Sequence, residues 1–537
     1  MRFYVSVYLF IAGIYLLTAS GRIGLSDNVA MFNVTQSIVS NGSFSAEPCD
    51  PNLEGHPNHC VLGKDGRYYA GFGLLPSVAA VPAILSARLV SKVAHVNPLA
   101  IMRLSVSLFT AVISPLVCVV FAMWTVGLGY SRQTAVVAAG VLAFGSPFWH
   151  YAVKGFYSEP YFALGLVLAA YLASCSESPY ASILAGLAFG AACGSRIIGM
   201  IMFPAFNLFL FLKNRERKLP KTRLLCELAF FTVSFFACAA LIGWSNYSRF
   251  GDVLKTGYQA AFPSTSALLS NPLLRGMGEL LFSNEVGLFV FAPWIFVSLI
   301  AFPLFLREHL AESALCGAIF LSNLLFFARY PSWHGGMVAG PRLLIATLPF
   351  LVLVLVPYIE GLRTARAQLR NRLPRAVAVG LIAAAFLVQA FGSLYPESRY
   401  YILTRFYEDR STKPWWTGSI PLASLDFLSR IRATEQGSAE QAAPVNPDPL
   451  AVSRQEEFAF ASMRTAANEQ DFLRSFPNSV NLILPDLILA KMRPLGLPRP
   501  ILFGYFTVSA IACLLGTIGI LKYSKSASKV RLEATYV

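Results

Sequence analysis

Long apolar runs alternate with short polar stretches along most of the chain. A run of about 20 apolar residues is enough for one helix to cross the hydrocarbon core of a bilayer. The pattern therefore predicts an all-α polytopic membrane protein with about twelve spanning helices. We expect them near residues 4–20, 104–124, 132–149, 160–175, 179–195, 198–212, 224–245, 286–306, 312–328, 343–358, 376–394 and 500–522.

Two segments depart from this alternation. Residues 73–90 (GLLPSVAAVPAILSARLV) contain two prolines and end in Arg88, which favours a helix lying at the membrane surface. Residues 395–499 are polar and include the flexible stretch EQGSAEQAAPVNPDP. We therefore expect a membrane module over 1–394, a small polar region over 395–499, and a last span with a basic tail over 500–537.

The composition supports this class, because 55% of the residues are hydrophobic and only 13% are charged, against roughly 25% charged in soluble domains. The net charge of +15 could suggest a nucleic-acid partner. The basic residues instead cluster in short loops, as in KNRERKLPKTR (213–223) and EGLRTARAQLRNRLPR (360–375), which is the positive-inside pattern of membrane proteins.

These loops, with the tail 522–537, place both termini in the cytoplasm and disfavour nucleic acid as a partner. The exported segments are then 21–103, 150–159, 246–285, 329–342 and 395–499. A cleaved signal peptide over 4–20 is the alternative, since LTAS precedes Gly21, but the loop count works better with this segment retained.

Nine cysteines are present, and seven of them lie in or beside apolar runs, where they serve as packing residues. Cys49 and Cys60 lie together in the first exported loop, so they are candidates for a disulfide. The alternative is two unpaired thiols.

Two acidic residues lie where an exported loop meets the membrane. Asp27 follows the first span, in LSDN, and Glu159 precedes the fourth, in KGFYSEPYFALG. An acid at this depth can act on a substrate, or it can simply cap a helix, and Pro160 after Glu159 fits the cap equally well.

Cations and aromatic rings occur on the same side of the membrane. GKDGRYYAGFGLLP holds Lys64, Arg67, Tyr68 and Tyr69; CGSRIIG holds Arg196; and ARYPSWHGGMVAGPRLL holds His334 and Arg342. Exported cations run against the positive-inside bias, and guanidinium groups suit phosphate. The alternative is that they reach toward lipid headgroups.

Carboxylates, cations and aromatic rings on one face suit the transfer of a sugar from a lipid-phosphate donor. One base must take a proton from the acceptor hydroxyl, and cations must stabilise the departing phosphate. A ligase or polymerase that uses a diphosphate-linked glycan is a close alternative. A transporter or flippase of lipid-linked sugars would instead place charges near the membrane midplane, and an assembly scaffold would need no such group of charges.

Several segments resemble, in order along the chain, bacterial GT-C glycosyltransferases of the protein-mannosyltransferase-like group, to which the aminoarabinose transferase of lipid A is distantly related. They are SDNVAMFNVTQSIVSNGSF (26–44), DGRYYAGFGLLPSVAAVP (65–82), FGSPFWHYAVKGFYSEP (144–160), FGDVLKTGY (250–258), GLFVFAPW (287–294), WHGGMVAGPRLLIATLPF (333–350) and NLILPDLILAK (481–491).

The resemblance implies a GT-C-like bundle with periplasmic juxtamembrane helices, a bacterial inner-membrane location and a periplasmic active site. It implies an inverting transferase that moves a hexose or pentose from a polyprenyl-phosphate carrier to a lipid, glycan or protein hydroxyl. Asp27 would be the base and Glu159 an auxiliary group.

Arg67 and Arg196 would bind the donor phosphate, with Lys64, His334 and Arg342 as further candidates and Tyr68 and Tyr69 beside them. Relatives often carry a second acid where this chain has Asn28, so Asp27 would act without an adjacent acid. No cofactor is implied, although Asp27 and Glu159 could flank a divalent metal ion.

Overall fold

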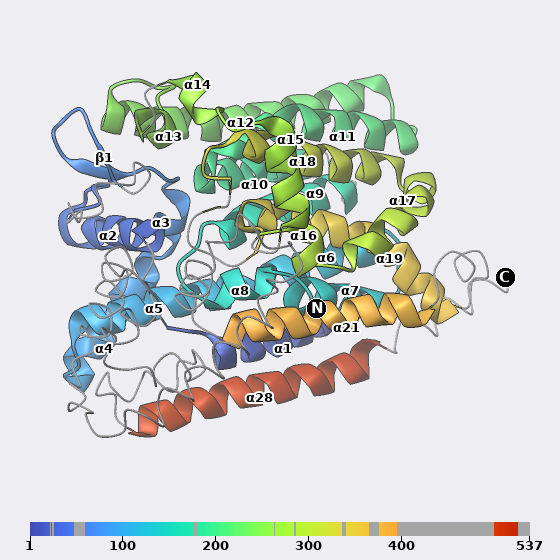
Figure 1. The fold of residues 1–537 in the computed structure, drawn as a ribbon, viewed down its shortest axis with the longest axis horizontal. Helices are drawn as coiled ribbons and strands as arrows, with labels where there is room; N and C mark the ends of the chain where they lie inside the picture. The colour runs from blue at the N-terminus through green and yellow to red at the C-terminus, as the bar shows by residue number, and fades with distance from the viewer. Residues whose placement is uncertain are drawn as a thin grey trace, which may run out of the picture.

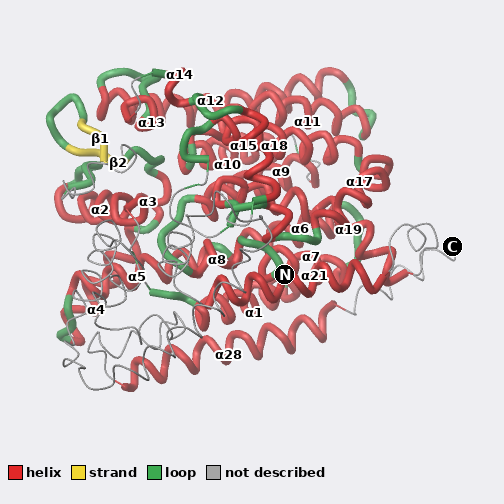
Figure 2. The backbone as a smooth tube through the Cα atoms, in the orientation of Figure 1, coloured by secondary structure: helices red, strands yellow, loops and turns green. Residues whose placement is uncertain are grey.

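The computed structural model describes residues 1–21, 23, 26–47, 60–175, 178, 180–261, 264–283, 286–333, 335, 340–364, 375–394 and 499–524 of the 537-residue chain. Helices dominate these residues, and the strands among them form one two-stranded hairpin (Figure 2). The predicted all-α architecture is confirmed. Most of the region 395–499 lies outside the described residues.

Within the described residues, six helical segments are long and apolar enough to cross a membrane: Pro98–Gly127, Ile197–Glu216, Lys221–Phe250, Leu310–Arg329, Arg342–Leu362 and Phe503–Ser524. Five shorter apolar helices accompany them: Arg2–Thr18, Arg132–Phe144, Glu159–Cys175, Ala181–Ser195 and Arg375–Ala390. Each coincides with a predicted span, so the chain is a multi-pass membrane protein. The predicted span 286–306 is divided into α16 and α17 around Pro293.

The N-terminal half contains α1 (Arg2–Thr18), α2 (Ser26–Asn41), β1 (Cys60–Leu62), β2 (Tyr68–Ala70), α3 (Leu75–Ala79), α4 (Val81–Ala94), α5 (Pro98–Ile113), α6 (Pro115–Gly127), α7 (Arg132–Phe144), α8 (Phe148–Val153), α9 (Glu159–Cys175), α10 (Ala181–Ser195), the 3-10 helix η2 (Ile197–Met202), α11 (Phe203–Glu216) and α12 (Lys221–Phe250). The remainder contains α13 (Gly257–Ala261), α14 (Thr265–Leu268), α15 (Leu273–Phe282), α16 (Leu288–Phe291), α17 (Ile295–Glu308), α18 (Leu310–Arg329), the 3-10 helix η3 (Arg342–Thr347), α19 (Leu348–Thr364), α21 (Arg375–Leu394) and α28 (Arg499–Ser524).

Local sequence explains where several of these helices begin. The side chain of Asn97 accepts hydrogen bonds from the backbone N–H groups of Leu99 and Ala100, and Pro98 occupies the first turn, where its missing N–H costs nothing. The span that apolar character alone predicts from residue 104 therefore begins earlier, at Pro98. Ser131 caps α7 in the same way, by accepting from the N–H of Thr134.

The first and last described helices pack against each other along one side of the bundle (Figure 1). A Cβ atom added at Gly13 would meet the backbone of Ser509 and Cys513, and one added at Gly516 would meet the backbone of Phe10. Small residues permit this close approach, because membrane helices associate through tight packing rather than through water exclusion.

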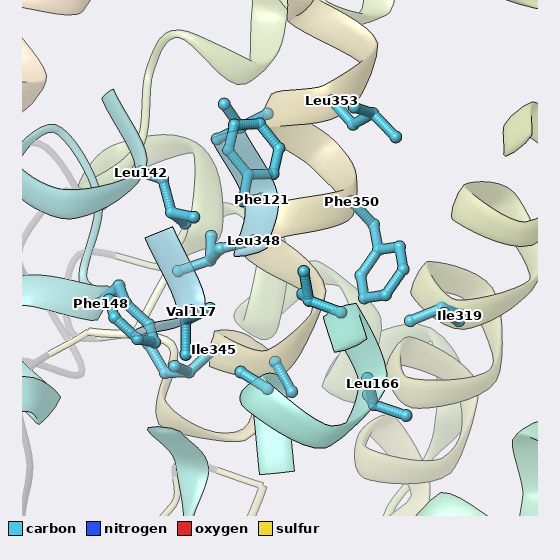
Figure 3. Packing of buried hydrophobic residues seen from close by; sticks show 14 of the residues in the cluster. Val117, Phe121, Leu142, Phe148, Leu166, Ile319, Ile345, Leu348, Phe350 and Leu353 are labelled. Atoms are coloured by element: carbon cyan, nitrogen blue, oxygen red, sulfur yellow. The ribbon is translucent and has the colours of Figure 1, made fainter. Parts of the chain in front are cut away.

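A hydrophobic core connects the central helices of the bundle. Figure 3 shows side chains from α6, α7, α8, α9, α18, η3 and α19 meeting there. Among them are Val117, Phe121, Leu142, Phe148, Leu166, Ile319, Ile345, Leu348, Phe350 and Leu353. This packing fixes the positions of α9, α18 and η3, whose ends carry or adjoin the site described below.

The first part of the predicted exported segment 21–103 contains regular structure. It forms α2 and the antiparallel β1–β2 hairpin, in which Cys60 pairs with Ala70. These elements gather with α3, α4, α13 and α14 at one end of the bundle, on the left of Figure 1. The segment predicted to lie at the membrane surface forms α3 and α4, where Leu85, Leu89 and Val93 are exposed.

Candidate active site

The two acids selected from the sequence both lie in the first turn of a helix. Asp27 follows the first residue of α2, and Glu159 is the first residue of α9. The partial positive charge at a helix N-terminus stabilises a carboxylate there. A capping role is therefore available to both acids, and their other partners distinguish the two.

Arg342 joins the acids through one guanidinium group. Its Nη2 lies 2.7 Å from Asp27 Oδ2, and its Nε donates to Glu159 Oε1 at 2.7 Å. Its Nη1 donates to the backbone carbonyl of Gly335 at 3.0 Å. Three different nitrogen atoms therefore contact three different segments, which the planar guanidinium allows and a lysine ammonium does not.

The segment before Arg342 supplies the turns that deliver it. Gly335 and Gly340 have φ of +77° and +80°, in the left-handed region that glycine adopts without strain. Gly340 also packs against the ring of Phe291, where a Cβ atom would lie 3.1 Å from a ring carbon. Side chains at these two positions would displace the start of η3, and the guanidinium of Arg342 with it.

Arg196 reaches the same carboxylate from another direction. It ends α10 in an extended conformation, and η2 begins at the next residue. Its Nη1 donates to Glu159 Oε1 at 2.6 Å, and its guanidinium carbon lies 5.6 Å from the ring centroid of Phe327. Within the described part of the chain, its Nε and Nη2 have no hydrogen-bond partner.

The four side chains differ in how far water can reach them. Asp27 is 15% exposed, whereas Glu159 is 1% exposed and receives both guanidinium groups on one oxygen. Arg196 and Arg342 are also nearly buried, at 9% and 8%. Two positive and two negative charges cancel, which limits the cost of burying them together. We refer to Asp27, Glu159, Arg196 and Arg342 as the exported charge cluster, after the side of the membrane on which the sequence analysis expects them.

Arg67 and Tyr69, two of the predicted donor-binding residues, lie on the β1–β2 hairpin and contact Asp65 there. Tyr69 donates a hydrogen bond to Asp65 Oδ2 at 2.8 Å, and Arg67 lies 3.9 Å from the same oxygen. The hydrogen bond from Tyr69 lowers the pKa of Asp65, while burial raises the pKa of Tyr69 to about 12. Arg67 is 57% exposed, so this ion pair contributes little.

Lys64 and Tyr68 also lie on this hairpin. The Lys64 ammonium lies 4.3 Å from the ring centroid of Tyr247, at the end of α12, and Tyr68 is 40% exposed. Among the contacts of the described residues, none joins Lys64 or Tyr68 to the exported charge cluster. Their role in binding a donor stays a prediction.

Two further predicted residues, His334 and Cys49, lie outside the described residues. Cys60 takes part in a disulfide. Among the described residues the free cysteines are Cys118, Cys175, Cys193, Cys226, Cys238, Cys316 and Cys513. Cys118, Cys193 and Cys316 are buried, as a packing role predicts, whereas Cys226 is exposed.

The described residues contain no group of three or more His, Cys, Asp or Glu side chains that could hold a metal ion. Asp27 and Glu159 are instead bridged by the guanidinium of Arg342, which places a fixed positive charge between them.

Three aromatic residues near the cluster were not selected from the sequence. The ring of Tyr157 lies 5.1 Å from the Arg342 guanidinium carbon, and that of Phe327 faces Arg196. The charges of all four members of the cluster act on the pKa of Tyr258, in α13. Tyr157 and Tyr258 lie in FGSPFWHYAVKGFYSEP and FGDVLKTGY, two of the segments that resemble the glycosyltransferases. Their membership of these segments was the sequence signal that could have identified them.

No family model and no curated protein matches the chain. Solved structures of the oligosaccharyltransferase AglB from Archaeoglobus fulgidus are similar to it, at 13–14% identity and TM-scores of 0.43–0.45. One of them is in complex with zinc and sulfate, and another with an inhibitory peptide and a dolichol-phosphate. The match covers 77–78% of this chain but only 56–58% of those chains.

Proposed function

We propose that this protein is an integral-membrane glycosyltransferase, which moves one sugar from a polyprenyl-phosphate carrier to a hydroxyl acceptor. The observation that carries the proposal is the exported charge cluster. It combines a partly exposed carboxylate with a guanidinium that has unused donors, and fixes both through Glu159 and Arg342. The cluster stands at the ends of helices, whereas a transporter would place such charges near the middle of spans.

Each member of the cluster has a distinct role in this proposal. Asp27 is the base, because it is the more exposed acid and can reach an acceptor. Arg196 binds the donor phosphate through its Nε and Nη2. Glu159 is held by both arginines, so it positions them rather than taking a proton.

The reaction follows from these positions. A carboxylate oxygen of Asp27 takes the proton of the acceptor hydroxyl, and the acceptor oxygen attacks the anomeric carbon. The bond from that carbon to the phosphate oxygen breaks, and the lipid phosphate leaves as an anion stabilised by Arg196. No acid is needed for the leaving group, and a single displacement inverts the anomeric centre.

The ion pair between Asp27 and Arg342 adds one requirement. While Arg342 holds Asp27, the carboxylate is a weaker base, because a neighbouring positive charge favours its ionised form. A bound donor phosphate competes for this guanidinium and thereby releases Asp27 for the acceptor. The location that fits this reaction is a bacterial inner membrane with cytoplasmic termini and the cluster at the periplasmic face.

Substitution of Asp27 tests the proposal. Cells lacking the protein would be complemented with wild type, Asp27→Asn or Asp252→Asn, and envelope lipids and glycans compared by mass spectrometry. Loss of a general base reduces turnover by about 10²- to 10⁴-fold, so Asp27→Asn should remove the sugar that wild type adds. Asp252 is exposed, and within the described residues its side chain accepts a hydrogen bond from the nearby N–H of Leu254 and from no other group, so Asp252→Asn serves as the control.

A second measurement separates a transferase from a flippase of lipid-linked sugars. In detergent solution the two sides of the membrane no longer exist, so a transferase still joins the sugar to its acceptor and a flippase does not. Transfer in detergent by wild type, absent with Asp27→Asn, supports the proposal. Full transfer by Asp27→Asn, with normal expression, would contradict it.

A further inference from the structure

Tyr258 approaches the exported charge cluster from a loop that contributes no charged group to it. It lies in α13, after the long helix α12. Burial raises the pKa of Tyr258, and the charges of Arg196, Asp27, Arg342 and Glu159 also act on the phenol, with Arg196 and Asp27 the strongest of the four. The phenol is therefore neutral and can donate a hydrogen bond at physiological pH.

The backbone around Tyr258 packs against the same segment that contacts the end of α10, next to Arg196. A Cβ atom at Gly257 would collide with the backbone of Gly71, which directly follows β2. The start of α13 therefore packs against the end of β2. Two residues after Gly71, a Cβ atom at Gly73 would collide with the carbonyl groups of Gly194 and Ser195. Residues 71–73 thus lie between α13 and the end of α10, where Arg196 begins.

The ring of Tyr258 is held on one side and its hydroxyl is unused. Phe72 meets the ring edge to face, with centroids 6.2 Å apart and planes at 84°. Within the described part of the chain, no residue forms a hydrogen bond with the phenol oxygen. The side chain is partly exposed. The hydroxyl is therefore open to a bound molecule and can donate to one.

The positions of Asp27 and Arg196 identify the part of the substrate concerned. In the proposed reaction the acceptor hydroxyl lies at Asp27 and the donor phosphate at Arg196, so the transferred sugar must lie between them. Tyr258 packs on Phe72, and the neighbouring Gly73 adjoins Gly194 and Ser195, directly before Arg196. We propose that Tyr258 contacts the transferred sugar, donating its phenol hydrogen to a sugar hydroxyl, and so contributes to the choice of sugar.

This inference rests on the proposed function, and a binding experiment tests the two separately. Purified full-length protein in lipid nanodiscs would be titrated with a polyprenyl phosphate and with the same lipid phosphate carrying different hexoses and pentoses. Wild type should bind at least one glycosylated lipid more tightly than the bare phosphate. The ratio of the two affinities isolates the contribution of the sugar from that of the phosphate and the lipid.

Tyr258→Phe removes only the hydroxyl and keeps the ring against Phe72. Loss of one neutral hydrogen bond should reduce the affinity ratio by about three- to tenfold. The affinity for the bare phosphate should stay within about twofold of wild type, because that lipid has no sugar hydroxyl to accept the bond. Tyr180→Phe is the matched control, because Tyr180 begins α10 at the end opposite Arg196 and is 68% exposed. It should leave both affinities unchanged.

The outcomes point in different directions. A wild type that prefers a glycosylated lipid, with the preference reduced only in Tyr258→Phe, supports the role of Tyr258. An unchanged preference in Tyr258→Phe overturns that role and leaves the proposed function standing. A wild type that binds every glycosylated lipid no better than the bare phosphate overturns the proposed function, and the role of Tyr258 with it. An equal loss of both affinities in Tyr258→Phe assigns the hydroxyl to the phosphate and also overturns the inference.

Discussion

Replacing Arg342 with glutamine should destabilise the protein through its effect on Asp27. The substitution removes two ion pairs, each with an N–O distance of 2.7 Å, from groups that are 1–15% exposed. Glu159 keeps Arg196, but Asp27 loses the cation that bridges it to Glu159. Breaking a buried pair on one side costs about 3–5 kcal/mol; the partial exposure of Asp27 favours the lower end, about 3 kcal/mol.

Removing the acid as well should restore part of this stability. In Asp27→Asn/Arg342→Gln the remaining pair, Glu159 and Arg196, is neutral overall. We therefore expect the double variant to be more stable than Arg342→Gln by about 1–3 kcal/mol. The free energy of unfolding would be measured by titration with a denaturing detergent, followed through tryptophan fluorescence.

The control removes an acid that Arg342 does not contact. Glu279 pairs with Arg275 on the exposed face of α15, so Glu279→Gln should add independently to Arg342→Gln, within about 0.5 kcal/mol. The reasoning would be refuted if Asp27→Asn and Arg342→Gln were equally additive, because the two side chains would then not interact in the folded protein.

Two further predictions concern other parts of the chain. Gly516→Leu should lower the melting temperature, because its side chain would collide with the backbone of α1 at a cost of about 1–3 kcal/mol. Gly504→Leu, in the same helix, meets open space and should leave the melting temperature unchanged. Equal effects of the two substitutions would contradict the close packing of α1 and α28. Tyr69 has its pKa raised to about 12 by burial, so its contribution to hairpin stability should be complete below the usual pKa near 10 and be lost as pH rises through 12. The free energy of unfolding would be compared between wild type and Tyr69→Phe as the pH rises from the usual pKa through 12, and the difference between the two should shrink over that range.

The membrane helices followed from the sequence because each needs only a long apolar run. The positions of Asp27, Glu159, Arg196 and Arg342 at the ends of helices also followed, since the ends of apolar runs can be read from the sequence. The structure brings these four together, although they come from widely separated parts of the chain.

Other features depend on tertiary contacts that no local pattern encodes. The sequence analysis placed residues 26–41 in an exported segment without assigning a helix, but they form α2, whose buried residues such as Phe32 pack on neighbouring helices. The proximity of Tyr258 to the cluster depends on the contact between Gly257 and Gly71, which are far apart in sequence. The central position of Arg342 likewise required the geometry of three segments at once.

The long separation between Glu159 and Arg342, 183 residues, has a consequence for biosynthesis. As the chain is synthesised from its N-terminus, Asp27 and Glu159 are made long before Arg342. The two ion pairs of Arg342 can form only when η3 is in place. The complete cluster is therefore a late product of insertion, and a chain truncated before η3 cannot assemble it.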